Sequence, residues 1–509
     1  MTTPATFAQR WREAVAAVPD HVFLVWEDGE ERVTTWSYRA FDDLVDEIAG
    51  GLAGRGAGPG RPVHVALANS PAFVAVWLAA TRLGATIVPS DPRATTRELA
   101  DPIRRTQPAV GFCAADRVDV YGPAAEGGPE VISVDEVDTD LDTLRGAPLA
   151  DAAPTPEASS PAAVMFTSGT TSAPKGVVVT QANYAFAGDV MAAAAGLDHA
   201  DRQLVVLPMF HANAQYYSFA SAISVGASVA LMSAFSATRF LGQAARHYAT
   251  HASLFAAPMR MILAKGGEPV RGLSLRHCWY AQNVARDQYD TLTSLFGCRP
   301  RQLYGMTETM PAVLTNRALA PVPGSMGGPT LGCNVDLRTP EGDDPVPEGE
   351  VGEVVVGGAR GATIFAGYLD DPETTEASFR GAWFSTGDLA TRDGDGRYYF
   401  VGRRGDVLKV AGENVSTVEV EAVISEHPSV LEAAVVGMPD MVRDEVPVAH
   451  VVLAPGAPPV GADELAEWCE ARLAPSKLPR EIFFVDELPR TSVGKIRKFL
   501  LEAPSAQPR

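Results

Sequence analysis

The sequence predicts an α/β fold in which a large N-terminal body of stacked αβ subdomains is followed by a small mobile α+β C-terminal domain. Two observations lead to this prediction. Amphipathic helical patterns alternate with short apolar strand patterns over most of the chain, as they do in α/β proteins. The 509 residues are 46% hydrophobic and 20% charged, which allows a large core divided over more than one domain.

The first elements follow from the hydrophobic periodicity near the N-terminus. Helices are expected at residues 7–18, 37–55 and 72–83, because apolar side chains recur there at helical spacing. Short apolar runs at residues 63–68 and 86–89 predict strands between them. The start of the chain has no long apolar run, so we expect no signal or transit peptide and a cytoplasmic location.

A segment rich in proline, alanine and serine, at about residues 147–162, predicts a surface linker before a strand at residues 163–166. Strands are also expected at residues 352–356 and 398–401, and an acidic loop that contains proline and glycine is expected before them at residues 339–349. These elements indicate a second subdomain of the same body.

The residues after Gly402 form a compact tail of the size of a small domain. We predict a body of residues 1–401, a hinge at residues 402–406 and a mobile domain of residues 407–509. Within the tail, the pattern predicts helices at residues 417–426 and 462–473 and strands at residues 430–436 and 449–454.

The charge and the cysteines exclude several classes of function. The formal net charge of -20 argues against partners that carry phosphate charge, so we expect no nucleic-acid partner and no membrane partner. The most apolar stretch, residues 73–89, is interrupted by Arg82 and Gly84 and is not expected to span a membrane. The five cysteines are scattered and form no CxxC pair, which indicates neither a disulfide framework nor a zinc site.

Lysine is scarce, with six lysines among 42 basic residues. A lysine retained in such a chain is a candidate for a role that needs a compact ammonium group. Lys175 ends a hydroxyl- and glycine-rich loop that follows an apolar strand, and such a loop offers backbone N–H groups, hydroxyls and one cation to a polyphosphate. It is not a Walker A loop, because the lysine precedes its glycine. The candidate phosphate-binding residues are Thr167, Ser168, Gly169, Thr170, Thr171 and Lys175.

Two further motifs suit a nucleotide. Tyr304 can stack on a base, while Thr307 and Glu308 can hold Mg²⁺ through oxygen ligands, although a Thr-Glu pair can also cap a helix. Asp388, expected in a tight glycine turn, can bind ribose hydroxyls with Arg403 beside it. A carboxylate in a glycine turn is common, so this motif counts only together with the others.

The order and spacing of these motifs resemble the adenylate-forming superfamily of acyl-CoA synthetases, peptide-synthetase adenylation domains and beetle luciferases. The resemblance covers nearly the whole chain and includes a loop-borne Lys495 near the end. It is strongest to the carnitine/crotonobetaine-CoA ligase-like branch, in residues 361–368, 400–404 and 412–416.

The resemblance implies ATP, Mg²⁺ and, less directly, coenzyme A as cofactors, and a small carboxylic acid as substrate. The loop of residues 167–175 would bind pyrophosphate, Tyr304 would frame adenine, and Asp388 and Arg403 would hold the ribose. Lys495 would stabilise charge at the α-phosphate during adenylation. The residues implied for Mg²⁺ are Glu308 and Thr307.

The resemblance also implies an acyl pocket and a coenzyme A approach. His211 matches a position that lines and gates the pocket, although a buried structural histidine is the alternative. Gly412 belongs to the loop that approaches the pantetheine arm. The expected pocket residues are His211, Ala281, Gln282, Asn283, Gly305 and Met306.

Three departures from the family pattern leave the substrate and acceptor open. Residues 280–284 replace a Gly-Gly-x-Pro turn, which crowds the pocket and disfavours a long fatty acid. Gly405 stands at the hinge position and Ala411 replaces a glycine in the pantetheine loop. An acid-CoA ligase is therefore predicted, with an adenylating enzyme that uses a carrier-protein thiol, an amine or nitrite as the alternative.

Two other readings are disfavoured. A phosphotransferase would need a Walker or protein-kinase motif set, which the chain lacks. A non-catalytic nucleotide-binding module would not need Lys495. The sequence leaves open the acid and whether the chain forms a homodimer.

Overall fold

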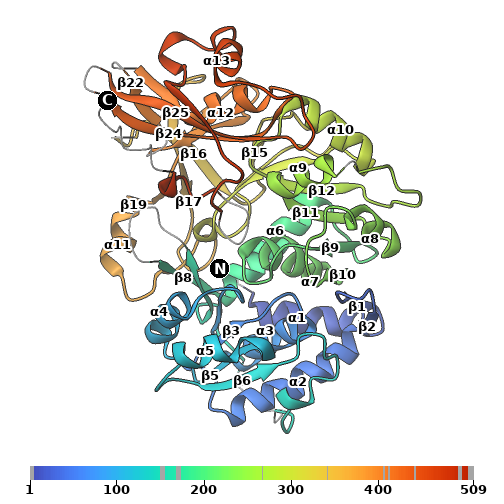
Figure 1. The fold of residues 1–509 in the computed structure, drawn as a ribbon. Coiled ribbons are helices and arrows are strands. Elements are labelled where there is room, and N and C mark those ends of the chain that lie inside the picture. The colour runs from blue at the N-terminus through green and yellow to red at the C-terminus, as the bar shows by residue number, and fades with distance from the viewer. Residues whose placement is uncertain are drawn as a thin grey trace.

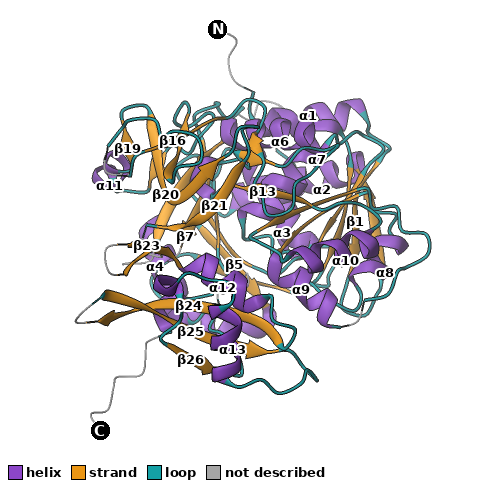
Figure 2. Ribbon diagram, turned by 90° about the horizontal axis from the view of Figure 1, so that it is seen from above, coloured by secondary structure: helices purple, strands orange, loops and turns teal. Residues whose placement is uncertain are grey.

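The computed structural model describes residues 5–149, 155–167, 174–265, 267–340, 342–404, 407–410, 413–440, 443–490 and 496–501. Two large sheets, a third smaller sheet and a C-terminal α+β domain make up the structure, and the C-terminal domain covers one end of the body (Figure 1). Figure 2 shows the same arrangement from above, with the C-terminal domain beside the body.

The first sheet has seven strands in the order β18-β8-β7-β4-β3-β5-β6. Its strands β3 to β7 are parallel, whereas β8 and β18 are antiparallel additions at one edge. The bounds are β3 (Val63–Ala66), β4 (Ile87–Pro89), β5 (Val110–Ala114), β6 (Glu130–Val134), β7 (Pro161–Thr167), β8 (Lys175–Thr180) and β18 (Gly367–Tyr368).

The second sheet has nine strands in the order β15-β14-β13-β12-β11-β9-β10-β1-β2, with a parallel centre from β13 to β1. The bounds are β1 (Val22–Glu27), β2 (Val33–Ser37), β9 (Arg202–Val205), β10 (Ser228–Met232), β11 (His251–Phe255), β12 (His277–Ala281), β13 (Arg301–Tyr304), β14 (Leu314–Thr315) and β15 (Gly328–Pro329).

Buried helices connect the two large sheets. Helix α6 contacts β8 of the first sheet and the π-helix η3, which in turn contacts β9 and β11 of the second sheet. Local signals define the helix ends: Ser70 caps the N-terminus of α3, and Gly84 (φ 72°) ends it. The helices of the body are α1 (Phe7–Ala17), α2 (Tyr38–Gly54), α3 (Pro71–Leu83), α4 (Thr96–Thr106), α5 (Val118–Ala124), α6 (Gln181–Ala195), η3 (Asn213–Ala220), α7 (Ser221–Val225), α8 (Phe240–Arg246), α9 (Ala256–Ala264), α10 (Arg286–Phe296) and α11 (Pro372–Ala377).

The two smaller sheets are largely antiparallel. The third sheet contains β16 (Asn334–Arg338), β17 (Gly352–Gly357), β19 (Phe379–Arg380), β20 (Trp383–Arg392) and β21 (Tyr398–Arg403). The C-terminal domain contains β22 (Val407–Val410), β23 (Glu413–Ser416), α12 (Thr417–Ser425), β24 (Val430–Asp440), β25 (Asp444–Leu453), α13 (Ala462–Glu470) and β26 (Glu481–Phe484).

The segment predicted as a surface linker, at about residues 147–162, lies between elements that belong to both large sheets. The strand β7 already begins at Pro161, inside the expected linker. The strands on either side of the linker also exchange partners, because β7 pairs with β4 of the first sheet and β1 pairs with β10 of the second. The linker therefore joins elements of interleaved sheets and does not separate two units.

The predicted elements agree with the structure within a few residues at most ends, and β25 begins five residues before the expected 449. All five cysteines are unpaired thiols. Within the described ranges, none of the helices combines the length and apolar character needed to cross a bilayer.

Candidate active site

A cleft of about 2720 Å³ lies between the body and the C-terminal domain. Its walls come from all three sheets of the body and from α12, β24 and the last described residues of the C-terminal domain. Among the described residues, nine lysines and arginines and seven carboxylates line it. The cleft is thus locally rich in cations although the whole chain has a net charge of -20, as a polyphosphate site requires.

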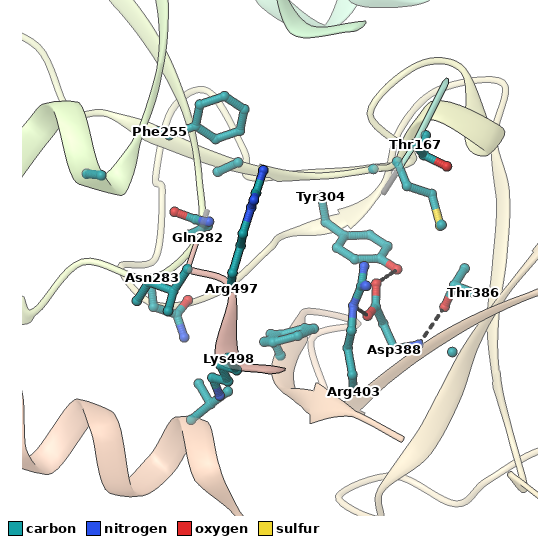
Figure 3. Close-up of a pocket in the computed structure, with 18 of the residues that line it drawn as sticks. Thr167, Phe255, Gln282, Asn283, Tyr304, Thr386, Asp388, Arg403, Arg497 and Lys498 are labelled. Atoms are coloured by element: carbon teal, nitrogen blue, oxygen red, sulfur yellow. Dashed lines mark hydrogen bonds and ion pairs between the residues drawn. The ribbon is translucent and has the colours of Figure 1, made fainter. Parts of the chain in front are cut away.

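Tyr304, Asp388 and Arg403 form a connected cluster on one wall of the cleft (Figure 3). The Tyr304 hydroxyl donates to Asp388 Oδ2 at 2.7 Å, and Arg403 Nε donates to Asp388 Oδ1 at 2.9 Å. Burial, together with the charge of Asp388, raises the pKa of Tyr304 well above its usual value. Tyr304 therefore stays protonated and remains a hydrogen-bond donor.

The backbone around Asp388 is a bulge inside a strand, which corrects the prediction of a tight turn. Ser385 of β20 pairs with Val355, and Leu389 pairs with Glu353, so three residues of β20 face one residue of β17. Gly387 within this bulge has φ 74°, which favours glycine. The sequence correctly indicated a glycine in an unusual backbone conformation, but β20 pairs with β17 on both sides of Gly387, so the segment is a bulge and not a turn.

Thr167 and Lys175 also line the cleft, where they pair across the β7–β8 hairpin and frame the predicted phosphate loop. The Lys175 ammonium lies 4.9 Å from the centre of the Tyr368 ring, and Tyr368 Oη donates to Glu308 Oε1 at 3.2 Å. The other predicted loop residues, Ser168, Gly169, Thr170 and Thr171, lie outside the described residues.

Arg105 of α4 supports the base of this loop and was missed by the sequence analysis. Its Nη1 donates to the Pro174 carbonyl at 2.6 Å, and its guanidinium lies 5.0 Å from the centre of the Phe166 ring. Arg105 is far from the loop in sequence, so only the folded arrangement of α4 beside β7 and β8 reveals the contact.

Glu308 and Thr307 begin the short helix η4 (Thr307–Thr309) after β13, and both line the cleft. Glu308 is 5% exposed, and its backbone carbonyl accepts from Phe365 N at 2.9 Å. The described residues hold no cluster of three or more His, Cys, Asp or Glu that could bind a metal. One carboxylate beside a polyphosphate nevertheless fits Mg²⁺, which usually takes one or two protein carboxylates together with phosphate oxygens and water.

The predicted acyl-pocket residues all line the same cleft: His211, Ala281, Gln282, Asn283, Gly305 and Met306. Gln282 has φ 73°, a backbone conformation that favours glycine. Asn283 Oδ1 accepts from Gln302 Nε2 at 2.8 Å, and the Asn283 carbonyl accepts from Arg260 Nη2 at 3.0 Å. This turn is therefore fixed from two sides.

Gly305 has no room for a side chain. A Cβ there would lie 2.9 Å from the Pro311 carbonyl oxygen and 3.1 Å from Tyr217 Oη. Tyr217, on η3, also lines the cleft, so the backbone at Gly305 and the Tyr217 ring form part of the same wall.

Two buried amides hold the segment that carries His211, and the sequence analysis missed both. Asn69 Oδ1 accepts from Met209 N at 2.8 Å, while Asn69 Nδ2 donates to the Leu207 carbonyl at 3.1 Å. From the other side, Gln215 Nε2 donates to the Met209 carbonyl at 2.6 Å. These bonds fix the backbone two residues before His211.

The C-terminal domain contributes a short segment to the cleft. The predicted Lys495 and Gly412 lie outside the described residues, but Ile496, Arg497 and Lys498 line the cleft. Arg490 pairs with Ile496 as an isolated antiparallel bridge, which brings together the two sides of the Lys495 segment. Figure 3 shows Arg497 extending into the cleft from this segment.

Ion pairs anchor this segment within its own domain. Lys498 Nζ lies 2.8 Å from Glu421 Oε1 and also donates to Thr417 Oγ1 at 3.0 Å. Arg490 pairs with Glu432. On the facing wall, burial lowers the pKa of Arg260, while the charge of Glu432 acts in the opposite direction.

Comparison with known proteins gives the family. Residues 11–369 match the AMP-binding enzyme family, and residues 419–495 match the AMP-binding enzyme C-terminal domain. The chain belongs to the AMP-binding enzymes. The crotonobetaine/carnitine-CoA ligase of Salmonella paratyphi A is 31% identical to it over 510 residues, covering 96% of this chain and 97% of the relative.

Solved structures resemble this AMP-binding enzyme over nearly its full length. The anthranilate CoA ligase AuaEII in complex with anthranoyl-AMP has a TM-score of 0.88 at 25% identity, covering 98% of this chain and 97% of that one. The predicted fold class, the adenylate-forming superfamily with its carnitine/crotonobetaine-CoA ligase-like branch, and an AMP-forming acid-CoA ligase are confirmed by these matches.

The arrangement of the two domains resembles a nucleotide-bound relative. ATP-bound MatB from Rhodopseudomonas palustris has a TM-score of 0.88 at 26% identity, covering 97% of this chain and 98% of that chain. The apo form of MatB has a TM-score of 0.78 with the same coverage and identity. Because the two structures are of one protein, their different scores reflect conformation, and the present structure is nearer to the ATP-bound form.

Proposed function

We propose that this acid-CoA ligase activates a small carboxylic acid that is short, branched or aromatic, with ATP and Mg²⁺, and then transfers the acyl group to coenzyme A. The observation that carries the proposal is that one cleft joins the Tyr304–Asp388–Arg403 cluster to the turn containing Gln282 and Asn283. A nucleotide and an acid bound at these two places would lie within one cleft, as adenylation requires.

The nucleoside end explains how ATP would be oriented. Asp388, held by Tyr304 and Arg403, has carboxylate oxygens suited to accept hydrogen bonds from ribose hydroxyls. The Tyr304 ring is suited to pack on adenine. Lys175 and the loop after Thr167 would bind the pyrophosphate portion, because backbone N–H groups and an ammonium favour phosphate oxygens.

The reaction at the α-phosphate needs added positive charge, because negative charge builds up as the acid oxygen attacks and pyrophosphate leaves. We assign Lys495 to this role, since Ile496 and Arg497, its neighbours in sequence, line the cleft. Mg²⁺, when bound, neutralises phosphate charge, and Glu308 with Thr307 would hold it.

The acid pocket supports a compact substrate. The Asn283 turn is fixed by Gln302 and Arg260, and Gly305 lies against Tyr217, so this part of the wall would not move aside readily for a long straight chain. Relatives that act on small acids point the same way, since one is an anthranilate CoA ligase and another a crotonobetaine/carnitine-CoA ligase.

Coenzyme A is the proposed acceptor, with a pivot at residues 402–406 between a body of residues 1–401 and a mobile domain of residues 407–509. After adenylation the mobile domain would turn, withdraw Lys495 and bring Gly412 towards the acyl-adenylate. A cytoplasmic location, where ATP and coenzyme A are available, belongs to the same proposal. Whether the enzyme works as a homodimer is a matter for measurement of its mass in solution.

A screen for pyrophosphate release over small aliphatic, betaine-like and aromatic acids, with and without coenzyme A, tests the proposal. Mass spectrometry should detect AMP and one acyl-CoA. If acyl-adenylate accumulates without acyl-CoA, and a carrier-protein thiol, an amine or nitrite consumes it, then that compound and not coenzyme A is the acceptor. ADP as the product would contradict adenylation altogether.

A further inference from the structure

Asn213 is a buried residue in the wall of the cleft whose side-chain amide has no hydrogen-bonding partner among the described residues. It begins the π-helix η3 two residues after His211, is 5% exposed and lines the cleft. Neither Asn213 Nδ2 nor Asn213 Oδ1 has a hydrogen-bonding partner in the part of the chain that the structure describes. A buried amide that lacks both a donor and an acceptor partner is rare in folded proteins and calls for a specific explanation.

The position of Asn213 relates it to the acyl end of the cleft. Tyr217 follows one helical turn later on η3 and also lines the cleft, and its hydroxyl lies against Gly305. The neighbours of Asn213 in the chain that also line the cleft are the apolar Phe210 and Ala212, with His211 between them. A single polar group among apolar walls orients a ligand and selects it by its hydrogen bonds.

Gln302 provides a second, independent observation. It is 2% exposed and lines the cleft, and its Nε2 is occupied by Asn283 Oδ1. Its Oε1 has no partner among the described residues. Two residues that line the cleft therefore contain one buried amide donor and two buried amide acceptors that have no partner among the described residues.

We propose that Asn213 selects an acid that carries a hydroxyl or amino substituent on its short-chain or aromatic acyl group. Such a substituent can donate to an amide oxygen and also accept from an amide nitrogen, which satisfies both free atoms of Asn213. The unused acceptor of Gln302 suits a second donor of the same kind of substrate. The inference rests on the proposed function, because it names the class of acid that the adenylation site takes.

The test uses the full-length enzyme with ATP, Mg²⁺ and pairs of acids that differ only in a hydroxyl against a methyl group. Suitable pairs are the isomeric hydroxybenzoates against methylbenzoates, and 3-hydroxybutyrate against 3-methylbutyrate. In at least one pair, the wild type should favour the hydroxyl member about 10²-fold in kcat/KM for pyrophosphate release, because the methyl leaves a polar site unpaired. Asn213→Leu should remove that preference or reverse it.

A preference for the methyl member in every pair, or the same preference in wild type and Asn213→Leu, would overturn the inference. Failure of the proposed function looks different, since the wild type would then release no pyrophosphate with any acid of the wider screen. In that case thermal unfolding still tests whether the Asn213 amide lacks a partner in the folded protein. Asn213→Leu should melt at or above the wild-type temperature, because it removes an unpaired polar group.

A lower melting temperature by several degrees would mean that the fold already satisfies the amide, and would also overturn the inference. Thr81→Val is the matched control. Thr81 Oγ1, on α3, is likewise buried and has no partner among the described residues, but Thr81 does not line the cleft. Its removal should leave the melting temperature near that of the wild type and the choice of acid unchanged.

Discussion

The body and the C-terminal domain contribute to the cleft in different ways. On the body side, Asp388 and Glu308 are 3% and 5% exposed and are held by bonds from other strands. On the C-terminal side, the segment that ends in Arg497 and Lys498 is more exposed and is anchored by ion pairs within its own domain. This difference is consistent with the proposed division, in which the body would bind the substrates and the C-terminal domain would supply groups that act and then leave.

The largest effect expected from this division is that of Lys495→Ala. Adenylation, measured as pyrophosphate exchange, should fall about 10³-fold while ATP affinity stays nearly unchanged, because the lysine acts on charge that develops in the transition state. Thioester formation from a supplied acyl-adenylate should change little.

Lys498→Met is a matched control for this variant, because Lys498 pairs with Glu421 inside the C-terminal domain. It should slow both half-reactions by less than about tenfold, as expected for a positioning residue. If Lys495→Ala damages both half-reactions equally, the assignment of separate roles to the two sides of the cleft is wrong.

On the body side, Glu308→Ala should have the largest effect. The loss of a carboxylate ligand should raise the Mg²⁺ concentration needed for half-maximal rate and reduce adenylation about 10²-fold. Titration of the rate with Mg²⁺ checks this. Tyr368→Phe removes the hydroxyl that donates to Glu308 but keeps the carboxylate, so it should move the titration curve far less. An unmoved curve for Glu308→Ala would remove Glu308 from the metal site.

Gly412→Leu tests the second action proposed for the C-terminal domain. A bulky side chain in the pantetheine loop should slow thioester formation about 10²-fold by displacing the thiol, while adenylation continues. The Gly412→Leu enzyme should release pyrophosphate and then accumulate acyl-adenylate. Normal acyl-CoA formation by the variant would show that this loop does not border the acceptor.

The two sides also differ in how far the sequence could predict them. The strand before Thr167, the motif around Tyr304 and the pairing of Asp388 with Arg403 carry local signals, and the structure brings the last three side chains together. These motifs could be recognised from the sequence because each is a pattern of residues that lie close together in the chain.

The parts that the sequence analysis missed depend on contacts between distant segments. Arg105 reaches the Pro174 carbonyl 69 positions away, and Asn69 reaches the Met209 amide 140 positions away. The pairing of strands from opposite sides of the linker was missed for the same reason, because β1 with β10 and β4 with β7 are contacts between segments distant in sequence. The bulge at Gly387 looked like a turn because both need a glycine at positive φ.

A smaller effect is expected from Asn283→Gly, which relaxes the body side without removing a charge. The variant loses the bond between Asn283 Oδ1 and Gln302 Nε2 and opens the turn next to the acid. The ratio of kcat/KM between longer and shorter acids should rise about tenfold. A panel of acids of increasing length measures this, and efficient use of palmitate by the wild type would contradict the compact pocket.

The smallest effect on activity is expected in the interior of the body, at His64 on β3. His64 is fully buried, with Nδ1 2.7 Å from Tyr121 Oη and Nε2 3.0 Å from Ser90 Oγ. Burial lowers the pKa of His64 from 6.5 to about 3. The folded protein therefore keeps the ring neutral, whereas the unfolded chain takes up a proton once the pH falls below about 6.5.

The contribution of His64 to stability is consequently complete above about pH 6.5 and is lost as the pH falls towards 3, at about 1.4 kcal/mol per pH unit. Burial lowers the pKa of His251 and His277 as well, so they add to the same slope. His64→Gln should reduce the slope of the unfolding free energy against pH by the contribution of one proton, about 1.4 kcal/mol per pH unit, while activity at neutral pH is retained. Urea unfolding between about pH 4.5 and 6.5 measures it. Ser90→Ala, which keeps the imidazole, should retain the full slope, and an equal slope in His64→Gln would mean that this ring does not set the acid sensitivity of the body.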